Sequence, residues 1–377
     1  MKVYLDNAAT TPLAEEVFEA MAPVLKTTFG NPSSTHSYGR EVRGLVETAR
    51  RSIAKMLNVT PGEITFTSGG TEADNMAIKG AVHDLGVKTI ITSTIEHHAV
   101  LHTVEELEKE GVKVHYVQLD ADGAVDLNDL EKALQENENC LVSLMHANNE
   151  VGNLLPLEKV GEMCRQYGAY FHSDTVQTMG HYPFDLQEIP VDFITGAAHK
   201  FHGPKGIGFL YINKRLKIQP LIHGGSQERS MRAGTENVYG IVGLAKALEL
   251  CNEEIEEHKT SISGIKQYMI GALKTALPEV AFNGKSASEN ESLYTVLSVS
   301  LPPTDKAGML LFNLDIKGVA CSGGSACSSG SNLGSHVLRG IQAKADRPSV
   351  RFSFSRYTTK EDVDYAVQCL KDIYTIQ

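Results

Sequence analysis

The stretch ITGAAHKFHGPKGIGFLY, residues 194–211, decides how the surrounding chain is interpreted. The apolar run Val191–Thr195 leads into small residues, then His199 and Lys200, a glycine-rich segment and a second apolar run. This order predicts a strand, a tight turn and a strand, with a lysine at the rim. A lysine flanked by small residues at a strand end is not a typical solvated lysine. We therefore interpret Lys200 as an amine presented to a cofactor, and Lys205 as structural or surface.

Before this stretch, short apolar runs alternate with segments that have helical spacing of apolar residues. The predicted strands are 63–67, 88–92, 112–118, 140–145, 169–172 and 191–195, and the predicted helices between them are 71–85, 97–110, 127–135 and 157–166. Such alternation predicts an α/β fold with a mostly parallel sheet covered on both faces. Ligands bind at the carboxyl ends of the strands in sheets of this kind, so the loops that follow the strands are the candidate site.

The chain has 377 residues, which favours two domains over one. After about residue 262 the pattern changes to a smaller α+β arrangement. Helices are predicted at 14–27, 36–57, 234–257, 263–276, 306–314 and 360–376, and further strands at 280–282, 294–301 and 350–354. We expect a large α/β domain over residues 15–261. Residues 1–14 and 262–377 would form a small α+β domain.

Composition excludes several classes of protein. The hydrophobic fraction of 42% allows a substantial core, whereas the net charge of −11 argues against nucleic-acid binding. No apolar run of 18 residues predicts a membrane span, and the first residues lack the apolar core of a signal peptide. The six cysteines are scattered without a CxxC pair, so neither a disulfide scaffold nor a zinc site is predicted. We expect a cytoplasmic protein with reduced thiols.

One candidate loop, Ser68-Gly69-Gly70-Thr71-Glu72, follows a predicted strand and opens a helix. Glycines let backbone N–H groups approach an anion, and a helix N-terminus favours negative charge. A threonine N-cap after a glycine turn explains the same residues equally well. The chain has neither a P-loop lysine here nor a GxGxxG motif, so the loop favours a single phosphate over a nucleotide.

Two further loops carry ionisable side chains directly after strands. Asp174 could hold a protonated ring nitrogen of a cofactor, although an N-cap aspartate is the commoner interpretation of such a residue. His97 could stack on a flat ring. His98 and His102, four residues apart, could supply half of a metal site, but no further ligand set accompanies them. We therefore predict surface histidines and no metal.

The remaining candidate loops contain amides and a thiol. Asn148 and Asn149 are either turn formers or neutral, directional hydrogen-bonding groups. Cys327 lies among glycines and serines, where a thiol is neither packed nor shielded and can act as a nucleophile. A disulfide between Cys321 and Cys327 is the alternative, which the cytoplasmic composition argues against. Cys321 follows Val319-Ala320 and is predicted to be a strand residue.

Together these motifs resemble the class V aminotransferase family of pyridoxal-phosphate enzymes, and more narrowly its NifS/IscS-type cysteine desulfurases. The resemblance covers essentially the whole chain. Its motifs are YLDNAATTP (4–12), NPSSTH (31–36), FTSGGTEADN (66–75), EHHAVL (96–101), HANNEVG (146–152), AAHKFHGPKGIGFLY (197–211), HGGSQERSMRAGTEN (223–237), SGGSAC (322–327) and VRFSFSRYTT (350–359). It implies the fold-type-I architecture, with a seven-stranded-type sheet between helices in the large domain.

The resemblance also implies a set of residues that bind pyridoxal 5'-phosphate. Lys200 would form a Schiff base with the cofactor and later move protons, while Asp174 would pair with the ring nitrogen. The other contacts would be Gln177 to the phenolic oxygen, His97 on the ring face, and Gly70, Thr71 and His199 at the phosphate, with Asn149 nearby.

For the reaction, the resemblance implies a desulfurase that converts L-cysteine to L-alanine and leaves a persulfide on Cys327. Asn149 and Arg351 would hold the substrate carboxylate. Thr235 would reach the cofactor phosphate of the other subunit, which implies a homodimer. The sulfur would pass to an acceptor such as an iron–sulfur scaffold, or serve tRNA thiolation.

Three departures from the family pattern stand out. Ala197 replaces a hydroxyl residue, so one contact to the cofactor phosphate is missing or supplied elsewhere. Cys321 adds a second thiol near Cys327. Housekeeping members of the family carry a tail beyond the position of Gln377, which leaves the identity of the docking partner open. The alternatives are a selenocysteine lyase or another β-lyase on this fold, a transaminase, which would not need Cys327, and a non-enzymatic sulfur-transfer platform.

Overall fold

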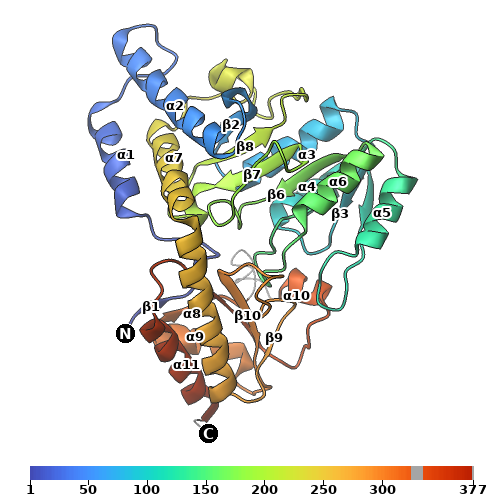
Figure 1. Ribbon diagram of the computed structural model, residues 1–377, viewed down its shortest axis with the longest axis vertical. Coiled ribbons are helices and arrows are strands. Elements are labelled where there is room, and N and C mark those ends of the chain that lie inside the picture. The colour runs from blue at the N-terminus through green and yellow to red at the C-terminus, as the bar shows by residue number, and fades with distance from the viewer. Residues whose placement is uncertain (324–333, 376–377) are drawn as a thin grey trace.

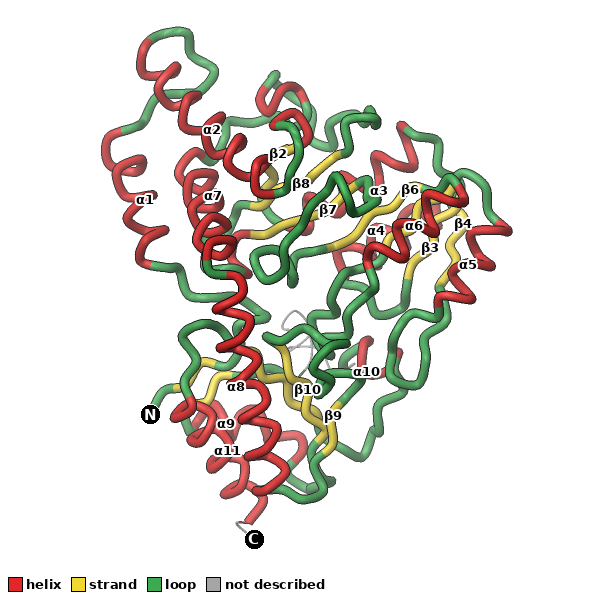
Figure 2. Tube along the Cα trace, in the orientation of Figure 1, coloured by secondary structure: helices red, strands yellow, loops and turns green. Residues whose placement is uncertain are grey.

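The computed structural model of the protein describes residues 1–323 and 334–375, and its elements form two lobes (Figures 1 and 2). The upper lobe in Figure 1 contains a seven-stranded sheet with helices around it. The lower lobe contains both chain ends and two smaller sheets. Helix α8 (Ile255–Ala276) runs from the upper lobe down one side of the lower lobe.

The seven-stranded sheet has the order β2-β8-β7-β6-β5-β3-β4. Its strands are β2 (Ile64–Thr67), β3 (Thr89–Thr92), β4 (Lys113–Tyr116), β5 (Cys140–Ser143), β6 (Tyr170–Asp174), β7 (Phe193–Ala197) and β8 (Gly208–Ile212). Only β8 runs antiparallel to its neighbours in this sheet, which confirms the predicted, mostly parallel α/β arrangement. Strand β8 reverses because the connection from β7 is too short for a crossover helix.

Helices surround this sheet at nearly the predicted positions. They are α1 (Glu15–Thr27), α2 (Ser37–Met56), α3 (Gly70–Asp84), α4 (His98–Lys109), α5 (Leu127–Glu136), α6 (Leu157–Tyr167) and α7 (Val238–Glu253). The prediction of a separate helix from residue 263 was wrong in its start, because α8 begins at Ile255 directly after α7. No glycine or proline marks this junction, so apolar periodicity could not locate it.

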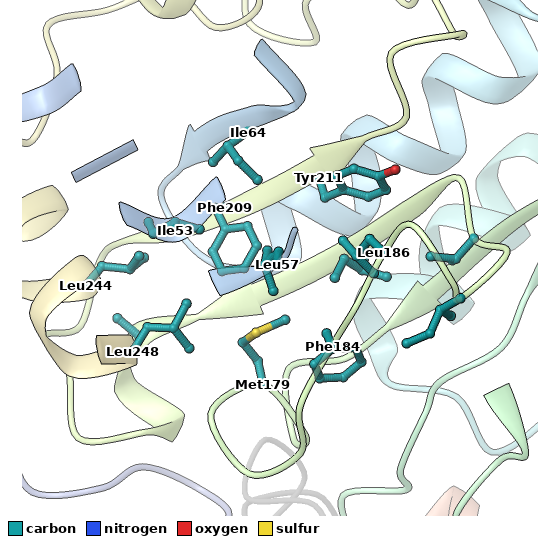
Figure 3. Packing of buried hydrophobic residues seen from close by; sticks show 14 of the residues in the cluster. Ile53, Leu57, Ile64, Met179, Phe184, Leu186, Phe209, Tyr211, Leu244 and Leu248 are labelled. Atoms are coloured by element: carbon teal, nitrogen blue, oxygen red, sulfur yellow. The ribbon is translucent and has the colours of Figure 1, made fainter. Parts of the chain in front are cut away.

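The core of the upper lobe follows from the two-residue periodicity of the strands. Phe209 and Tyr211 of β8 point to one face, where they pack with Leu244 and other side chains of α2 and α7 (Figure 3). Leu210 and Ile212 point to the opposite face and pack in a cluster with α3. Successive residues of a strand face opposite sides, so a wholly apolar strand needs cover on both faces.

The lower lobe contains a three-stranded antiparallel sheet and a two-stranded parallel one. Its elements are β1 (Val3–Tyr4), β9 (Ala281–Phe282), β10 (Val296–Ser300), α9 (Leu310–Ile316), β11 (Val319–Ala320), α10 (His336–Gly340), β12 (Ser349–Ser353) and α11 (Lys360–Thr375). Cys321 was predicted as a strand residue, but β11 ends one residue before it. Helix α8 crosses the expected domain boundary at residue 261, and that division stays a prediction.

The N-terminal segment joins the two lobes at the edge where the site lies. Asn7 Nδ2 donates to the Ser353 carbonyl oxygen at 2.8 Å in the lower lobe. The Thr11 amide donates to the His199 carbonyl oxygen at 2.9 Å in the upper lobe. Residues far apart in the sequence are thereby fixed around one cavity. Within the described part of the chain, no helix is long and apolar enough to cross a membrane.

Candidate active site

A cavity of about 240 Å³ lies at the carboxyl ends of the parallel strands, beside the N-terminal segment. Its walls include most of the predicted site residues: Gly70, Thr71, His97, Asn149, Asp174, Gln177, His199, Lys200 and Arg351. Thr235 is exposed in a separate hollow, and Cys327 lies outside the described residues. The cavity therefore brings together residues from six segments that are widely separated in sequence.

Lys200 lies in a short 3₁₀ turn, Ala198–Lys200, directly after β7. Its Nζ donates to the carbonyl oxygens of Ala8 at 2.7 Å and Ala9 at 2.9 Å. The predicted strand, turn and strand are present, and the 3₁₀ turn is an addition to them. The two carbonyl groups fix the amine at the cavity wall, as a nucleophile or proton carrier requires.

Asp174 is the last residue of β6 and is followed by a turn, so the N-cap interpretation is wrong. Its Oδ1 accepts from the Val176 amide at 2.9 Å and from Thr195 Oγ1 at 3.4 Å. Burial and the neighbouring Asp74 raise the pKa of the Asp174 carboxyl to about 6. A bound cation would reverse this shift, because an opposite charge favours the ionised carboxylate. The site is thus suited to a protonated ring nitrogen.

The N-terminus of α3 opens onto one end of the cavity. Gly69 is the N-cap and supplies no side-chain cap, so the alternative of a threonine N-cap is wrong. A Cβ on Gly70 would lie 2.7 Å from Val176 Cγ2, so a larger residue here would displace the Val176 side chain. Uncapped N–H groups at a helix N-terminus are a ready anion site. Thr71 and His199 border the same end, and so does Lys205, whose proximity the sequence did not indicate.

Two histidines at the cavity are held in the neutral form. His97 is the N-cap of α4, and its Nδ1 accepts from the Ala99 amide at 3.1 Å. Burial lowers the pKa of His97. Burial, together with Lys200 and Lys205, lowers the pKa of His199 to about 4. A neutral imidazole whose Nδ1 accepts carries its proton on Nε2 and can donate from there.

His98 and His102 lie beside a third histidine, His336. Their rings stack at 4.7 Å between centroids, and His98 lies 4.4 Å from the His336 ring. No group of three or more possible ligands for a metal ion occurs among the residues that the structure describes.

Gln177 and Arg351 also line the cavity. Gln177 Nε2 donates to the Ala8 carbonyl oxygen at 3.0 Å, the same oxygen that holds Lys200. Arg351 Nη1 donates to the Asn149 carbonyl oxygen at 2.7 Å, and its Nη2 donates to Asp6 Oδ1 at 2.9 Å. A guanidinium fixed in this way presents its remaining N–H groups to a carboxylate.

Sequence reasoning missed two buried acids near the cavity, Asp74 on its wall and Glu96 behind Met145. Burial raises the pKa of Asp74 to about 7 and that of Glu96 to about 8. Asp74 Oδ1 lies 3.3 Å from His172 Nε2 without hydrogen-bond alignment. Asp74 comes three residues after Thr71, so both lie on one face of α3. This spacing was the sequence feature that could have indicated Asp74 as a residue of the cavity wall.

Cys321 is the one thiol of the predicted loop region that the structure describes. It lies directly after β11 with a partly buried side chain, and it is not part of a disulfide. Burial raises the pKa of the Cys321 thiol to about 12. A thiol that stays protonated is a poor nucleophile, so Cys321 is not suited to attack.

A second, larger cavity of about 470 Å³ lies behind Met145 and is lined by residues such as His146, Lys285 and Glu291. Burial lowers the pKa of His146 to about 4, so this imidazole is neutral. Lys285 is paired with Glu291. The buried Glu96 also lines this cavity, but Lys200, Asp174 and Arg351 all line the smaller one instead. Chemistry rather than size therefore selects the smaller cavity.

Comparisons with known proteins agree with this arrangement. A family model described as "Aminotransferase class-V" matches residues 3–366. The chain is 47% identical to "Cysteine desulfurase IscS" of Dictyoglomus turgidum over 376 residues, 99% of this chain and 94% of the relative. It is 45% identical to "Putative cysteine desulfurase IscS 1" of Bacillus subtilis over 378 residues, covering 99% of this chain and 98% of the relative.

Solved structures show the same fold. A structure titled "NIFS-LIKE PROTEIN" superposes with a TM-score of 0.91 at 38% identity, covering 100% of both chains. The NifS-like protein from Rickettsia africae ESF-5 has a TM-score of 0.89 at 31% identity, also with 100% coverage of both. The architecture is therefore that of fold-type-I enzymes. The chain belongs to the class V aminotransferase family and, within it, to the NifS/IscS-type cysteine desulfurases.

Proposed function

We propose that this protein is a pyridoxal-phosphate-dependent cysteine desulfurase. It would convert L-cysteine to L-alanine and keep the sulfur as a persulfide on Cys327. The observation that carries the proposal is the single cavity where Lys200, Asp174, His97 and Arg351 meet, in a chain whose relatives are named cysteine desulfurases.

The wall residues fit the cofactor at each of its polar groups. Asp174 would pair with the ring nitrogen, and its raised pKa supports this role because binding a cation offsets the cost of its buried charge. Lys200 Nζ would bond to the carbonyl carbon. The remaining contacts would be His97 on the ring face, Gln177 at the phenolic oxygen, and Gly70, Thr71 and His199 at the phosphate. When bound, the cofactor would supply an electron sink for charge that develops on the substrate.

The chain's own groups would hold the substrate and move its protons. Arg351 and Asn149 would bind the substrate carboxylate, and the polar cavity wall would orient the amino group. Lys200 Nζ, held by two backbone carbonyl oxygens, would take the proton from the substrate α-carbon and return it later. Neutral His97 would add no charge that competes with this transfer.

Cys327 would carry out the sulfur transfer. Its thiolate would attack the substrate sulfur, forming an S–S bond while the carbon–sulfur bond breaks. The electron pair of the broken bond would stay with the carbon fragment, which takes up a proton and leaves as L-alanine. The net change is L-cysteine plus the Cys327 thiol giving L-alanine plus the Cys327 persulfide, so no external oxidant or reductant is needed.

We further infer a homodimer in which Thr235 reaches the partner's cofactor phosphate. Thr235 is exposed, and its hollow shares Ser68 and Gly206 with the opening beside Gly70. The bound sulfur would then pass to an acceptor such as an iron–sulfur scaffold or a tRNA-thiolation protein.

Incubation of the purified protein with L-cysteine and a thiol reductant tests the function through release of L-alanine and sulfide. Cys327→Ala should lose this turnover, whereas Cys321→Ser is the matched control and should retain it, because the Cys321 thiol is protonated. Full desulfuration by Cys327→Ala would show the persulfide proposal to be wrong. A purified protein without visible cofactor absorption, even after addition of pyridoxal phosphate, would show the cofactor proposal to be wrong.

A further inference from the structure

Asp6, in the turn after β1, contacts two residues from the far end of the chain. Its Oδ1 accepts from Arg351 Nη2 at 2.9 Å and from Ser322 Oγ at 2.8 Å. The Arg351 side chain is 2% exposed and that of Asp6 is 19% exposed, so the ion pair is largely removed from water. Ion pairs in such surroundings are screened less than surface pairs.

The guanidinium of Arg351 has donors left over after these contacts. Nη1 and Nη2 each make one hydrogen bond, to Asn149 and Asp6, and Nε is buried without a partner among the described residues. A guanidinium carries five N–H groups, so an incoming carboxylate can still be bound. Because Arg351 lines the cavity, this unused donor capacity belongs to the site.

Ser322 and Arg351 are paired through their backbones, and the Asp6 side chain binds the side chains of both. The Arg351 amide donates to the Ser322 carbonyl oxygen at 2.6 Å, and the Ser322 amide donates back at 3.2 Å. The planar guanidinium is therefore fixed from one side by Asp6 and from the other by Asn149. Such fixing lowers the entropy lost when a ligand binds.

We propose that Asp6 is a positioning residue that orients Arg351 and sets how tightly the cavity binds a carboxylate. This inference rests on the proposed function, in which Arg351 holds the carboxylate of an amino-acid substrate. Asp6 is an internal counter-ion of Arg351, so the substrate carboxylate must share the Arg351 guanidinium with it. Its negative charge repels the incoming carboxylate, while its hydrogen bond holds the guanidinium in place. Asp6 thus limits affinity and keeps the site from retaining the product, L-alanine.

Two substitutions separate charge from geometry. Asp6→Asn retains an Oδ1 acceptor for both Arg351 and Ser322 and removes only the charge. Asp6→Ala removes the charge and both hydrogen bonds. Ser322→Ala is the matched control, because it takes one hydrogen bond from Asp6 and leaves its charge.

The test is calorimetric titration of the cofactor-loaded protein with L-alanine, and with L-alaninamide, which lacks the carboxylate. Asp6→Asn should bind L-alanine about 5-fold more tightly than wild type and L-alaninamide with unchanged affinity, because one repulsive charge is gone. Ser322→Ala should change neither affinity by more than about 2-fold. Asp6→Ala should bind L-alanine less tightly than Asp6→Asn and lose about 10-fold in kcat/KM, because Arg351 is no longer oriented.

Unchanged or weaker binding of L-alanine by Asp6→Asn overturns the proposal, and so does equal tightening for L-alaninamide. If Asp6→Asn does not fold, Asp6→Ser, which is also neutral and short, takes its place with the same expectations. Titration of the cofactor-free protein with propionate and propionamide repeats the comparison without the cofactor. If only the desulfurase proposal is wrong, Asp6→Asn should still bind propionate more tightly than wild type does, with no such gain for propionamide. If the proposed role of Asp6 is wrong, this selective gain for propionate should be absent.

Discussion

Lys200 and Lys266 both use Nζ to donate to backbone carbonyl oxygens, but they lie in different lobes. Lys200 lies at the sheet edge on the wall of a cavity, beside the buried Asp174. Lys266 of α8 is 2% exposed, and its Nζ donates to Ser292 Oγ at 2.7 Å and to the Leu293 carbonyl oxygen at 3.0 Å. Burial lowers the pKa of Lys266 to about 7.

The difference shows that a perturbed amine alone does not identify a reactive one. By pKa alone, Lys266 would be a strong candidate for function. It is enclosed by its hydrogen-bond partners, however, whereas Lys200 adjoins space that a ligand can fill. An amine is suited to react where it adjoins a cavity that also contains a carboxylate for the cofactor and a group that binds the substrate carboxylate. The ends of parallel strands supply the amine and the carboxylate, and β12 of the lower lobe supplies Arg351. A packed helix face does not bring such groups together around a cavity.

Replacing each lysine tests this distinction most strongly. Lys200→Ala should lower the rate of L-alanine formation by on the order of 10⁴-fold, because it removes the amine that we propose binds the cofactor and moves the proton. Lys266→Met should retain the rate within about 3-fold. Measurement of L-alanine from L-cysteine decides, and a Lys200→Ala enzyme with more than about one tenth of wild-type activity would contradict the assignment.

Asp174→Asn tests the carboxylate of the sheet edge and should lower the rate by about 10²-fold. Wild-type affinity for pyridoxal phosphate should fall as the pH drops through about 6, because Asp174 then takes up a proton and no longer pairs with a cation. In titrations of the cofactor-free protein with pyridoxal phosphate, the affinity of Asp174→Asn should not show this fall with pH. Glu96→Gln is the control: the pKa of Glu96 is raised to about 8, so that carboxyl is already neutral. An unchanged profile for Asp174→Asn would contradict the role.

For the lower lobe, the expected effect of Lys266 is on stability. Its folded-state pKa of about 7 is below the ordinary 10.5, so the unfolded chain binds more protons between these values. Stability should therefore rise by about 2 kcal/mol from pH 7 to pH 9 through this residue. Urea unfolding at both pH values should give this rise in wild type and a smaller rise in Lys266→Met. Equal rises in both proteins would mean that Lys266 does not titrate as described.

The smallest expected effect concerns Ala197, which lines the cavity at a position where the family resemblance leads us to expect a hydroxyl residue. A Cβ placed on Gly70 would lie 3.8 Å from Ala197 Cβ, so this side chain adjoins the proposed phosphate end. Ala197→Ser should strengthen binding of pyridoxal phosphate by about 5-fold through one added hydrogen bond. Pyridoxal without the phosphate is the control ligand and should show no gain. An equal gain in affinity for both ligands would mean that the new hydroxyl does not bind the phosphate, which would contradict the prediction.

Much of the large lobe could be predicted from the sequence, because its contacts repeat at short range. Alternating apolar runs and helical spacing gave the sheet and its neighbouring helices, and the rule for parallel strands placed Asp174 and Lys200 at one edge. The boundary between α7 and α8 could not be predicted, since no local signal marks residue 254. The antiparallel course of β8 depends on the short connection after Lys200.

The sequence by itself determined the fold class, the lysine at the strand end and the loops that surround it, because these depend on residue periodicity and turn chemistry. Only the tertiary structure decided the electrostatics of the site. Burial raises the pKa values of Asp74, Glu96 and Asp174 together, and burial is a property of the folded molecule. The contact of Asp6 with Arg351 joins residues from opposite ends of the chain, and no local pattern encodes a pair at that separation.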